Sequence, residues 1–219
     1  MWDAPRGRIA AWAVLAAALV SPGEARDARP RPLPGIDLLR LVDVDRDKVA
    51  GDWTFDGTTL VSPAVQFGRI AIPYIPPEEY DLRIVAERQG RGNSLNVGLV
   101  AGGRQVMAIV DGFVPEPRSG LDLIDKKPFY DNETTDRRGL AFSETRPSTV
   151  TIAVRRARVR VVVDGRTIVD WKADYSRVSL WAGWFMHRPD TLFLGTWTTP
   201  QRIHSLELLP IGRPGKPLR

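Results

Sequence analysis

The chain has 219 residues, contains no cysteine and carries a formal net charge of +5. The absence of cysteine excludes disulfides, thiolate catalysis and cysteine-based zinc sites. The positive charge lies at the ends, since residues 26–31 carry +2 and residues 211–219 carry +3, whereas residues 32–210 are neutral. A duplex-binding domain usually carries its positive charge on the fold itself, so this distribution argues against a nucleic-acid partner.

Residues 1–25 have the features of a signal peptide. Two arginines precede the apolar run 9–20, which is too short to cross a bilayer that needs about 20 residues. Gly23 and Ala25 are the small residues of a possible processing site. The sequence therefore predicts an exported protein, periplasmic, cell-surface or extracellular, with no membrane span in the mature chain. An uncleaved anchor or a buried helix is the alternative.

Three further segments follow from composition. Residues 26–35 are rich in proline and arginine and predict a disordered spacer. Residues 36–211 are predicted to form one domain, and residues 212–219 a basic flexible tail. The chain has 19 glycines and 18 prolines, which favour many tight turns over long helices.

The domain is predicted to be all-β. Apolar residues alternate in short runs between turn signals, and helical periodicity is limited to residues 36–42. The predicted strands are residues 53–55, 60–62, 69–72, 80–88, 94–101, 104–111, 148–155, 158–163, 166–171, 192–196 and 202–209. So many short strands over about 175 residues indicate a two-sheet antiparallel β-sandwich, or jelly roll.

Two hairpins carry the clearest local signals. Gly102-Gly103 and Asp164-Gly165 predict two-residue turns that require positive φ. In the second hairpin, the alternate apolar residues of 150–154 are predicted to share a face with the valines of 159–163. Two longer stretches interrupt this pattern, residues 112–138 and 181–190, and long loops in compact β domains are often functional.

The order of these segments resembles concanavalin A-like lectin/glucanase domains, including laminin-G-like ones. The segments that carry the resemblance are residues 51–61, 80–100, 150–171 with its Val-Asp-Gly-Arg turn, and 192–208. Within this fold, the chain looks most similar to exported bacterial domains related to the 3-keto-glycoside hydrolase family. The resemblance implies a concanavalin A-like fold and a function linked to sugars, but a shared fold does not establish an activity.

Aromatic and polar side chains of the loops and of the central hairpin are the candidate ligand-binding residues. Sugar rings pack their C–H faces on aromatic rings, while polar neighbours bind the hydroxyl groups. The predicted ligand-binding residues are Asn96, Arg104, Asp111, Asp131, Asn132, Glu133, Trp184, His187 and Trp197. The alternatives are core packing for the tryptophans, and solvent-facing strand or turn positions for the others.

The sequence predicts no metal site and no cofactor, with calcium as a possible ion. His187 and His204 are the only histidines, and they are not at ligand spacing. The acidic stretch 43–47 begins like a calcium loop, but Lys48 and Thr54 stand where an EF-hand has glycine and glutamate.

We therefore predict an exported, non-catalytic carbohydrate-binding or cell-surface interaction module, whose partner is a glycan or another surface protein. One alternative is a glycoside-active hydrolase resembling the 3-keto-glycoside hydrolases, with Asp111, Asp122 and Glu133 as candidate acids. The alternating carboxylates of retaining sandwich glucanases are absent from the sequence. A structural, protein-binding sandwich is the other alternative.

Overall fold

A computed structural model describes residue 1 and residues 33–90, 92–113 and 115–219. The predicted signal peptide and most of the predicted spacer lie outside the described residues. Within the part of the chain that is described, no helix is long and apolar enough to cross a membrane.

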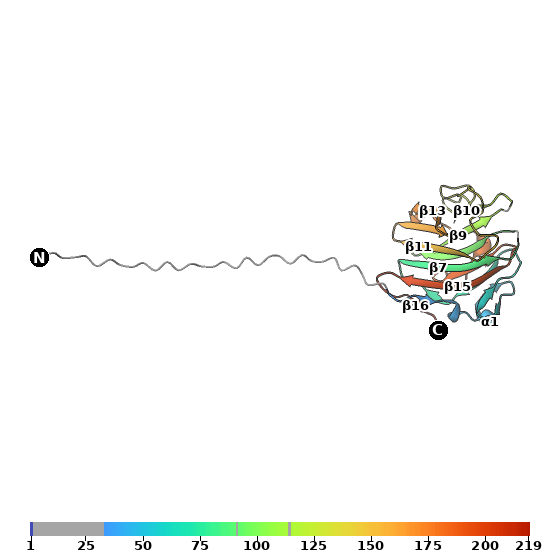
Figure 1. Cartoon of the computed structure of the whole chain (residues 1–219), viewed down its shortest axis with the longest axis horizontal. Coiled ribbons are helices and arrows are strands. Elements are labelled where there is room, and N and C mark those ends of the chain that lie inside the picture. Colours follow the sequence, from blue (N-terminus) through green and yellow to red (C-terminus); the bar gives the residue numbers. More distant parts are fainter. Residues whose placement is uncertain (2–32, 91, 114) are drawn as a thin grey trace.

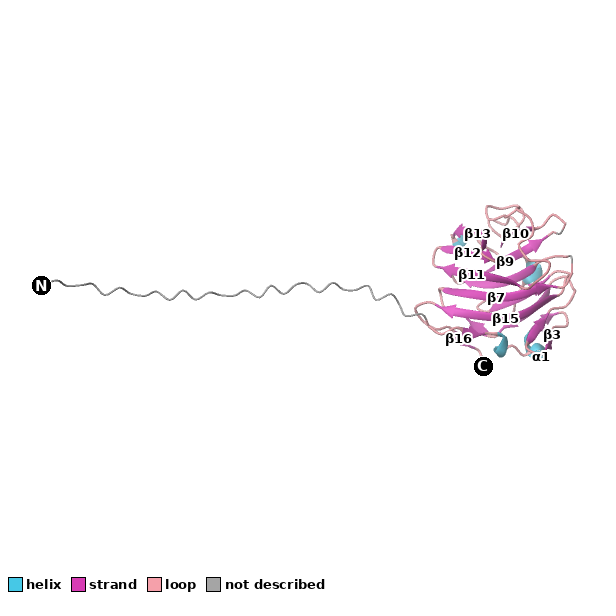
Figure 2. Cartoon of the chain, in the orientation of Figure 1, coloured by secondary structure: helices cyan, strands magenta, loops and turns pink. Residues whose placement is uncertain are grey.

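Two antiparallel sheets stacked face to face form the domain (Figures 1 and 2). The larger sheet contains β1 (Ile36–Asp37), β3 (Thr54–Asp56), β4 (Thr59–Val61), β7 (Tyr80–Arg88), β11 (Ser148–Arg155), β12 (Arg158–Val163), β13 (Arg166–Lys172) and β15 (Gln201–Pro210). Its order is β13-β12-β11-β7-β15-β4-β3, with β1 paired to β15. The six-stranded sheet contains β2 (Lys48–Ala50), β5 (Gly68–Ile72), β8 (Leu95–Ala101), β9 (Arg104–Gly112), β10 (Arg118–Asp122) and β14 (Leu192–Thr196), in the order β10-β9-β8-β14-β5-β2. The predicted two-sheet antiparallel β-sandwich is confirmed.

The remaining elements are short. They are the strands β6 (Tyr74–Ile75) and β16 (Lys216–Pro217), the helix α1 (Val44–Asp47), and the 3-10 turns η1 (Leu39–Leu41), η2 (Tyr175–Arg177) and η3 (Ala182–Trp184). η3 lies in the second of the two long stretches that the sequence marked as candidate functional loops.

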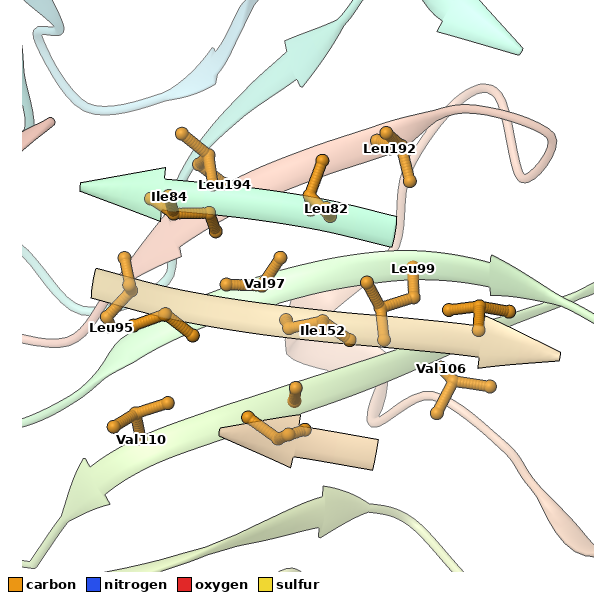
Figure 3. Close-up of a cluster of buried hydrophobic side chains, with 14 of the residues drawn as sticks. Leu82, Ile84, Leu95, Val97, Leu99, Val106, Val110, Ile152, Leu192 and Leu194 are labelled. Atoms are coloured by element: carbon orange, nitrogen blue, oxygen red, sulfur yellow. The ribbon is translucent and has the colours of Figure 1, made fainter. Parts of the chain in front are cut away.

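Alternate residues of each strand build the core between the sheets (Figure 3). Leu82 and Ile152 of the larger sheet are buried there together with Val97 and Leu194 of the six-stranded sheet. Each such side chain stabilises the fold by about 1.5–3 kcal/mol through burial. The predicted faces of strands 80–86, 150–154 and 159–163 are confirmed, because all their alternate apolar side chains are buried.

The two predicted hairpin turns are also confirmed. Gly102 and Gly103 have φ of 57° and 71°, and Asp164 and Gly165 have φ of 46° and 84°. Backbone of this kind suits a two-residue turn between twisted antiparallel strands.

Three stretches have local structure that the sequence pattern did not specify. Residues 36–42, where the pattern has helical periodicity, form β1 and the 3-10 turn η1, and β10 lies inside the long stretch 112–138. In the predicted flexible tail 212–219, β16 pairs with β6 and the Arg219 side chain contacts the Asp47 carboxylate.

A second apolar cluster lies on the other face of the six-stranded sheet. Met107, Ile109 and Phe193 alternate with core residues along β9 and β14, so they point away from the sandwich core. Trp184 and Met186, from the segment after η2, pack on them. The six-stranded sheet is therefore covered on both faces, and its outer face supports the candidate site.

Candidate functional site

A cavity of about 380 Å³ opens over the outer face of the six-stranded sheet. Cavities that bind small molecules have volumes of about 300–1,000 Å³ and combine apolar walls with a few placed polar groups. Asn96 of β8 and Ile109 of β9 contribute from the sheet, and the segment after β10 and the segment around η3 contribute from the loops. The aromatic residues that line the cavity are Phe113, Phe129, Tyr130, Trp181, Trp184 and Trp197.

These rings form two groups. In the first, the edge of Phe67 meets the rings of Trp181, Trp184 and Trp197, at centroid distances of 5.9, 5.1 and 4.6 Å. The rings of one group therefore hold each other at the edge-to-face angles that aromatic pairs prefer.

The second group comes from the loops that flank β10. Phe113 stacks on Phe129 at 5.5 Å, and the Tyr130 ring meets Phe113 edge-on at 4.7 Å. Phe113, Tyr130 and Trp181 all belong to the small set of large apolar side chains that remain exposed. Both groups thus present aromatic surface at the cavity.

A glycine allows the first group to approach the sheet. A Cβ atom at Gly195 would lie 2.7 Å from the Trp184 ring and 3.3 Å from the Asn96 Cβ. Gly195 pairs with Asn96 across β14 and β8, so the Trp184 ring lies over the backbone directly beside the amide of Asn96. The Arg69 guanidinium contacts the carbonyl of Gly183, which holds η3 in place over the sheet.

The side-chain amide of Asn96 is buried in the cavity without a hydrogen-bond partner among the described residues. The residue is 1% exposed and lines the cavity, and neither Oδ1 nor Nδ2 has a hydrogen-bond partner among the described residues. A buried polar group without a partner costs about 1–3 kcal/mol of folding free energy. The Asn96 side chain thus offers two N–H donors and two acceptor positions to a molecule in the cavity.

Asp122, the last residue of β10, is a buried carboxylate in the same cavity. One of its oxygens, Oδ1, accepts a hydrogen bond from the Phe129 N–H at 2.9 Å. Burial raises the pKa of Asp122 to about 6, and the Phe129 hydrogen bond opposes this shift. The carboxylate is therefore mostly ionised at neutral pH and can accept a further hydrogen bond from a donor in the cavity.

The Asp122→Asn variant is expected to be more stable than the wild type above pH 6. The folded pKa lies above the ordinary Asp value, so burying the charge lowers stability as pH rises from about 4 to 6, by about 2–3 kcal/mol in total. An amide avoids this cost and can still accept from the Phe129 N–H. Urea unfolding should show a gain of about 1–3 kcal/mol at pH 8 and little change at pH 4. An equal effect at both pH values would contradict this account of Asp122.

Of the predicted ligand-binding residues, the cavity brings together Asn96, Trp184 and Trp197. Arg104 and His187 are exposed and do not line it. Arg104 begins β9 and lies on the same face of the strand as the core residues Val106 and Ala108, opposite the face that carries Ile109, and His187 follows η3 at the surface.

Asp131, Asn132 and Glu133 lie in a separate pocket of about 220 Å³. The Asn132 amide donates to the Leu121 carbonyl at 2.9 Å, and its oxygen accepts from the Thr134 N–H at 2.9 Å. These hydrogen bonds fix the turn that follows β10, so the Asn132 side chain holds the loop together.

Glu133 is held by the protein as well. Its carboxylate accepts from the Trp171 indole N–H at 2.5 Å and pairs with Arg177 at 3.0 Å. These contacts, the Trp171 hydrogen bond first, lower the pKa of Glu133. Arg177 also pairs with Asp125 at 2.6 Å, which joins the pocket into one surface ion-pair network.

Asp111, also a predicted ligand-binding residue, does not line the cavity, because its carboxylate is enclosed and bound by other parts of the protein. The residue is 1% exposed, and its two oxygens accept from the N–H groups of Ala141 and Phe142 at 2.8 and 2.9 Å. Its carboxylate also pairs with the buried Arg88 at 3.6 Å. Asp111 thus ties a distant loop to β9 and has no face toward the cavity.

The candidate acids of the hydrolase alternative do not share one cavity. Asp122 lines the large cavity, Glu133 lines the separate pocket, and Asp111 is enclosed. In addition, the described residues contain no group of three or more histidine, aspartate or glutamate side chains that could hold a metal ion.

Several cavity residues were not among the predicted site residues. Trp181, Phe129 and Tyr130 occur in the two long stretches that the sequence marked as functional, and their adjacent aromatic residues were the available signal. Asp122 was considered only as a catalytic acid. Its place in the same cavity as Asn96 depends on the pairing of β10 with β9, which no local pattern indicated.

Comparison with known proteins supports the fold. No family model and no curated protein matches the sequence. The carbohydrate-binding module CBM66 from Bacillus subtilis is similar in structure, with a TM-score of 0.52, 9% identity, and coverage of 74% of this chain and 93% of that chain. The Crh5 transglycosylase is similar with a TM-score of 0.54, 15% identity, and coverage of 83% and 85%. The predicted nearness to the 3-keto-glycoside hydrolases gains no support here. At these identities the comparisons show the fold alone, an antiparallel β-sandwich, which is consistent with the predicted concanavalin A-like fold.

Proposed function

We propose that the chain is an exported carbohydrate-binding module that holds a sugar in the cavity over the six-stranded sheet. The observation that carries the proposal is the unpartnered amide of Asn96, buried at the base of an aromatic cavity. Such an arrangement leaves a stability cost in the free protein that a bound polar group removes.

A sugar is chemically complementary both to the aromatic rings of this cavity and to its buried polar groups. A pyranose ring has C–H faces that pack on aromatic rings and a rim of hydroxyl groups that need hydrogen-bond partners. Trp181 and Tyr130 offer the aromatic surface near the opening, whereas Asn96 and Asp122 offer the polar groups inside. The similarity in fold to a carbohydrate-binding module and to a transglycosylase is consistent with this proposal.

The number of carboxyl groups in the cavity favours binding of a sugar without hydrolysis. Most glycoside hydrolases place two carboxyl groups on either side of the scissile bond, about 5–10 Å apart. Among the described residues that line the cavity, Asp122 is the one carboxylate. We therefore propose a non-catalytic module.

The Trp181→Ala variant is expected to bind glycans about two- to tenfold more weakly than the wild type. Its indole is 54% exposed at the cavity, so the change removes a stacking surface worth about 0.5–1.5 kcal/mol with little effect on the core. The measurement is calorimetric titration with the tightest ligand found on a glycan array.

Phe185→Ala is the matched control. Phe185 belongs to the same segment and is 67% exposed, but it does not line the cavity. If both variants lost affinity equally, or if neither did, the cavity would not be the binding site.

A further inference from the structure

We infer that the cavity selects an acetamido sugar, that is, an N-acetylated hexosamine, and holds its acetamido group against the sheet with the ring toward the opening. The inference rests on the proposed function, because it names the class of sugar that the same cavity takes. It is carried by the relative positions of Asn96, Ile109 and Asp122.

These three residues come from three neighbouring strands of one sheet. Asn96 of β8 pairs with Ile109 of β9, and Asp122 of β10 pairs with Met107, two residues along β9. Adjacent strands lie about 4.8 Å apart, so the backbones of β8 and β10 are separated by about 10 Å. All three side chains line the cavity, with the buried apolar Ile109 between the two polar groups.

An acetamido group is complementary to this arrangement of two polar side chains with an apolar side chain between them. Its amide is planar and trans, so the N–H and the C=O point to opposite sides, and the methyl group points away from the sugar ring. In the cavity, the N–H donates to the Asp122 carboxylate, and the carbonyl oxygen accepts from Asn96 Nδ2. The methyl group then packs on Ile109, and the ring lies among the exposed rings of Trp181 and Tyr130.

This arrangement also gives hydrogen-bond partners to atoms that have none within the described part of the chain. Asn96 Nδ2 gains an acceptor, and Asn96 Oδ1 can accept from a hydroxyl group of the same sugar. Asp122 already accepts from the Phe129 N–H through Oδ1, so the ligand N–H becomes a second donor to this buried carboxylate.

Related sugars fit less well at the same position. A hydroxyl group in place of the acetamido group is too short to reach both Asn96 and Asp122, and it leaves Ile109 without an apolar partner. A free amine can still donate to Asp122, but it has no carbonyl oxygen to accept from Asn96 Nδ2 and no methyl group to pack on Ile109. A site that leaves a buried group unpaired discriminates strongly against that ligand.

The test compares four methyl glycosides by calorimetric titration of the full chain at pH 7.5. The probes are N-acetylglucosamine, N-acetylgalactosamine, glucose and glucosamine. At least one acetamido sugar is expected to bind on the order of tenfold or more tightly than glucose, which lacks both the amide hydrogen bonds and the methyl contact. It is also expected to bind more tightly than glucosamine, which lacks the hydrogen bond from Asn96 Nδ2 and the methyl contact.

Two variants test whether the preference for acetamido sugars depends on the Asn96 amide. Asn96→Asp keeps the size of the side chain but removes the Nδ2 donor, and it is expected to reduce the preference to within about threefold. Arg104→Ala, on the same pair of strands but outside the cavity, is the control and should keep the full preference. The comparison of sugars on the wild type stands even if Asn96→Asp folds poorly.

The outcomes separate the inference from the proposed function. Binding of glucose as tightly as the acetamido sugars would overturn the inference and leave a carbohydrate-binding module. An acetamido preference that survives in folded Asn96→Asp would overturn the role of Asn96. If the wild type bound none of these probes and no glycan on an array, both the inference and the proposed function would fail.

Discussion

Replacing Asp111 with alanine is expected to lower the free energy of unfolding by about 3–5 kcal/mol, because the change leaves a buried arginine without its counter-ion. The Arg88 side chain is 4% exposed and lies 3.6 Å from the Asp111 carboxylate. The N–H groups of Ala141 and Phe142 would lose their acceptors in the same step. Urea unfolding at pH 7 measures the effect.

The control for this prediction is an exposed ion pair. Asp56 pairs with Arg202 at 2.7 Å, with 69% of the Asp56 side chain exposed. Exposed pairs contribute less than about 1 kcal/mol, so Asp56→Ala should change stability little. If Asp111→Ala cost no more than Asp56→Ala, Asp111 would not be the structural residue that its contacts indicate.

Replacing Asn96 with leucine is expected to reduce glycan affinity by on the order of 100-fold and, at the same time, to maintain or raise stability. The amide makes no hydrogen bond to the described residues, so an apolar side chain of similar size removes a buried polar cost of about 1–2 kcal/mol. A residue that lowers stability but is needed for binding is typical of a functional site. Thermal unfolding and calorimetric titration of the same variant measure both effects.

Asn132→Leu provides the contrast for Asn96→Leu. The Asn132 amide bonds to the Leu121 carbonyl and the Thr134 N–H, so its loss should lower stability by about 1–3 kcal/mol.

Full-strength glycan binding by folded Asn96→Leu would show that the Asn96 amide does not contact the ligand.

The strands could be predicted from the sequence because their signal is local. β7, β11, β12 and β14 have the predicted bounds, since apolar residues alternate along each of them and turn residues end them. The shortest strands could not be predicted this way. β16 is only two residues long, and it is a strand because β6 lies beside it.

Only some of the residues that line the cavity could be picked out from the sequence. Asn96 stands out because it is polar within an apolar strand, and Trp184 because it lies in an aromatic loop. Asp111 gave the same signal as Asn96, but its partners Ala141 and Phe142 are about 30 residues away in the chain, and no periodicity reveals them. The sequence therefore marked polar positions on the sheet without separating those that the protein satisfies from those left for a ligand.

The most direct test of the central claim, that the cavity binds a carbohydrate through Asn96, is a glycan array probed in parallel with the wild-type full chain and the Asn96→Leu variant. We predict that the wild type binds a defined set of glycans and that folded Asn96→Leu binds none of them. Equal binding by the two proteins, or no binding by either, would contradict the claim.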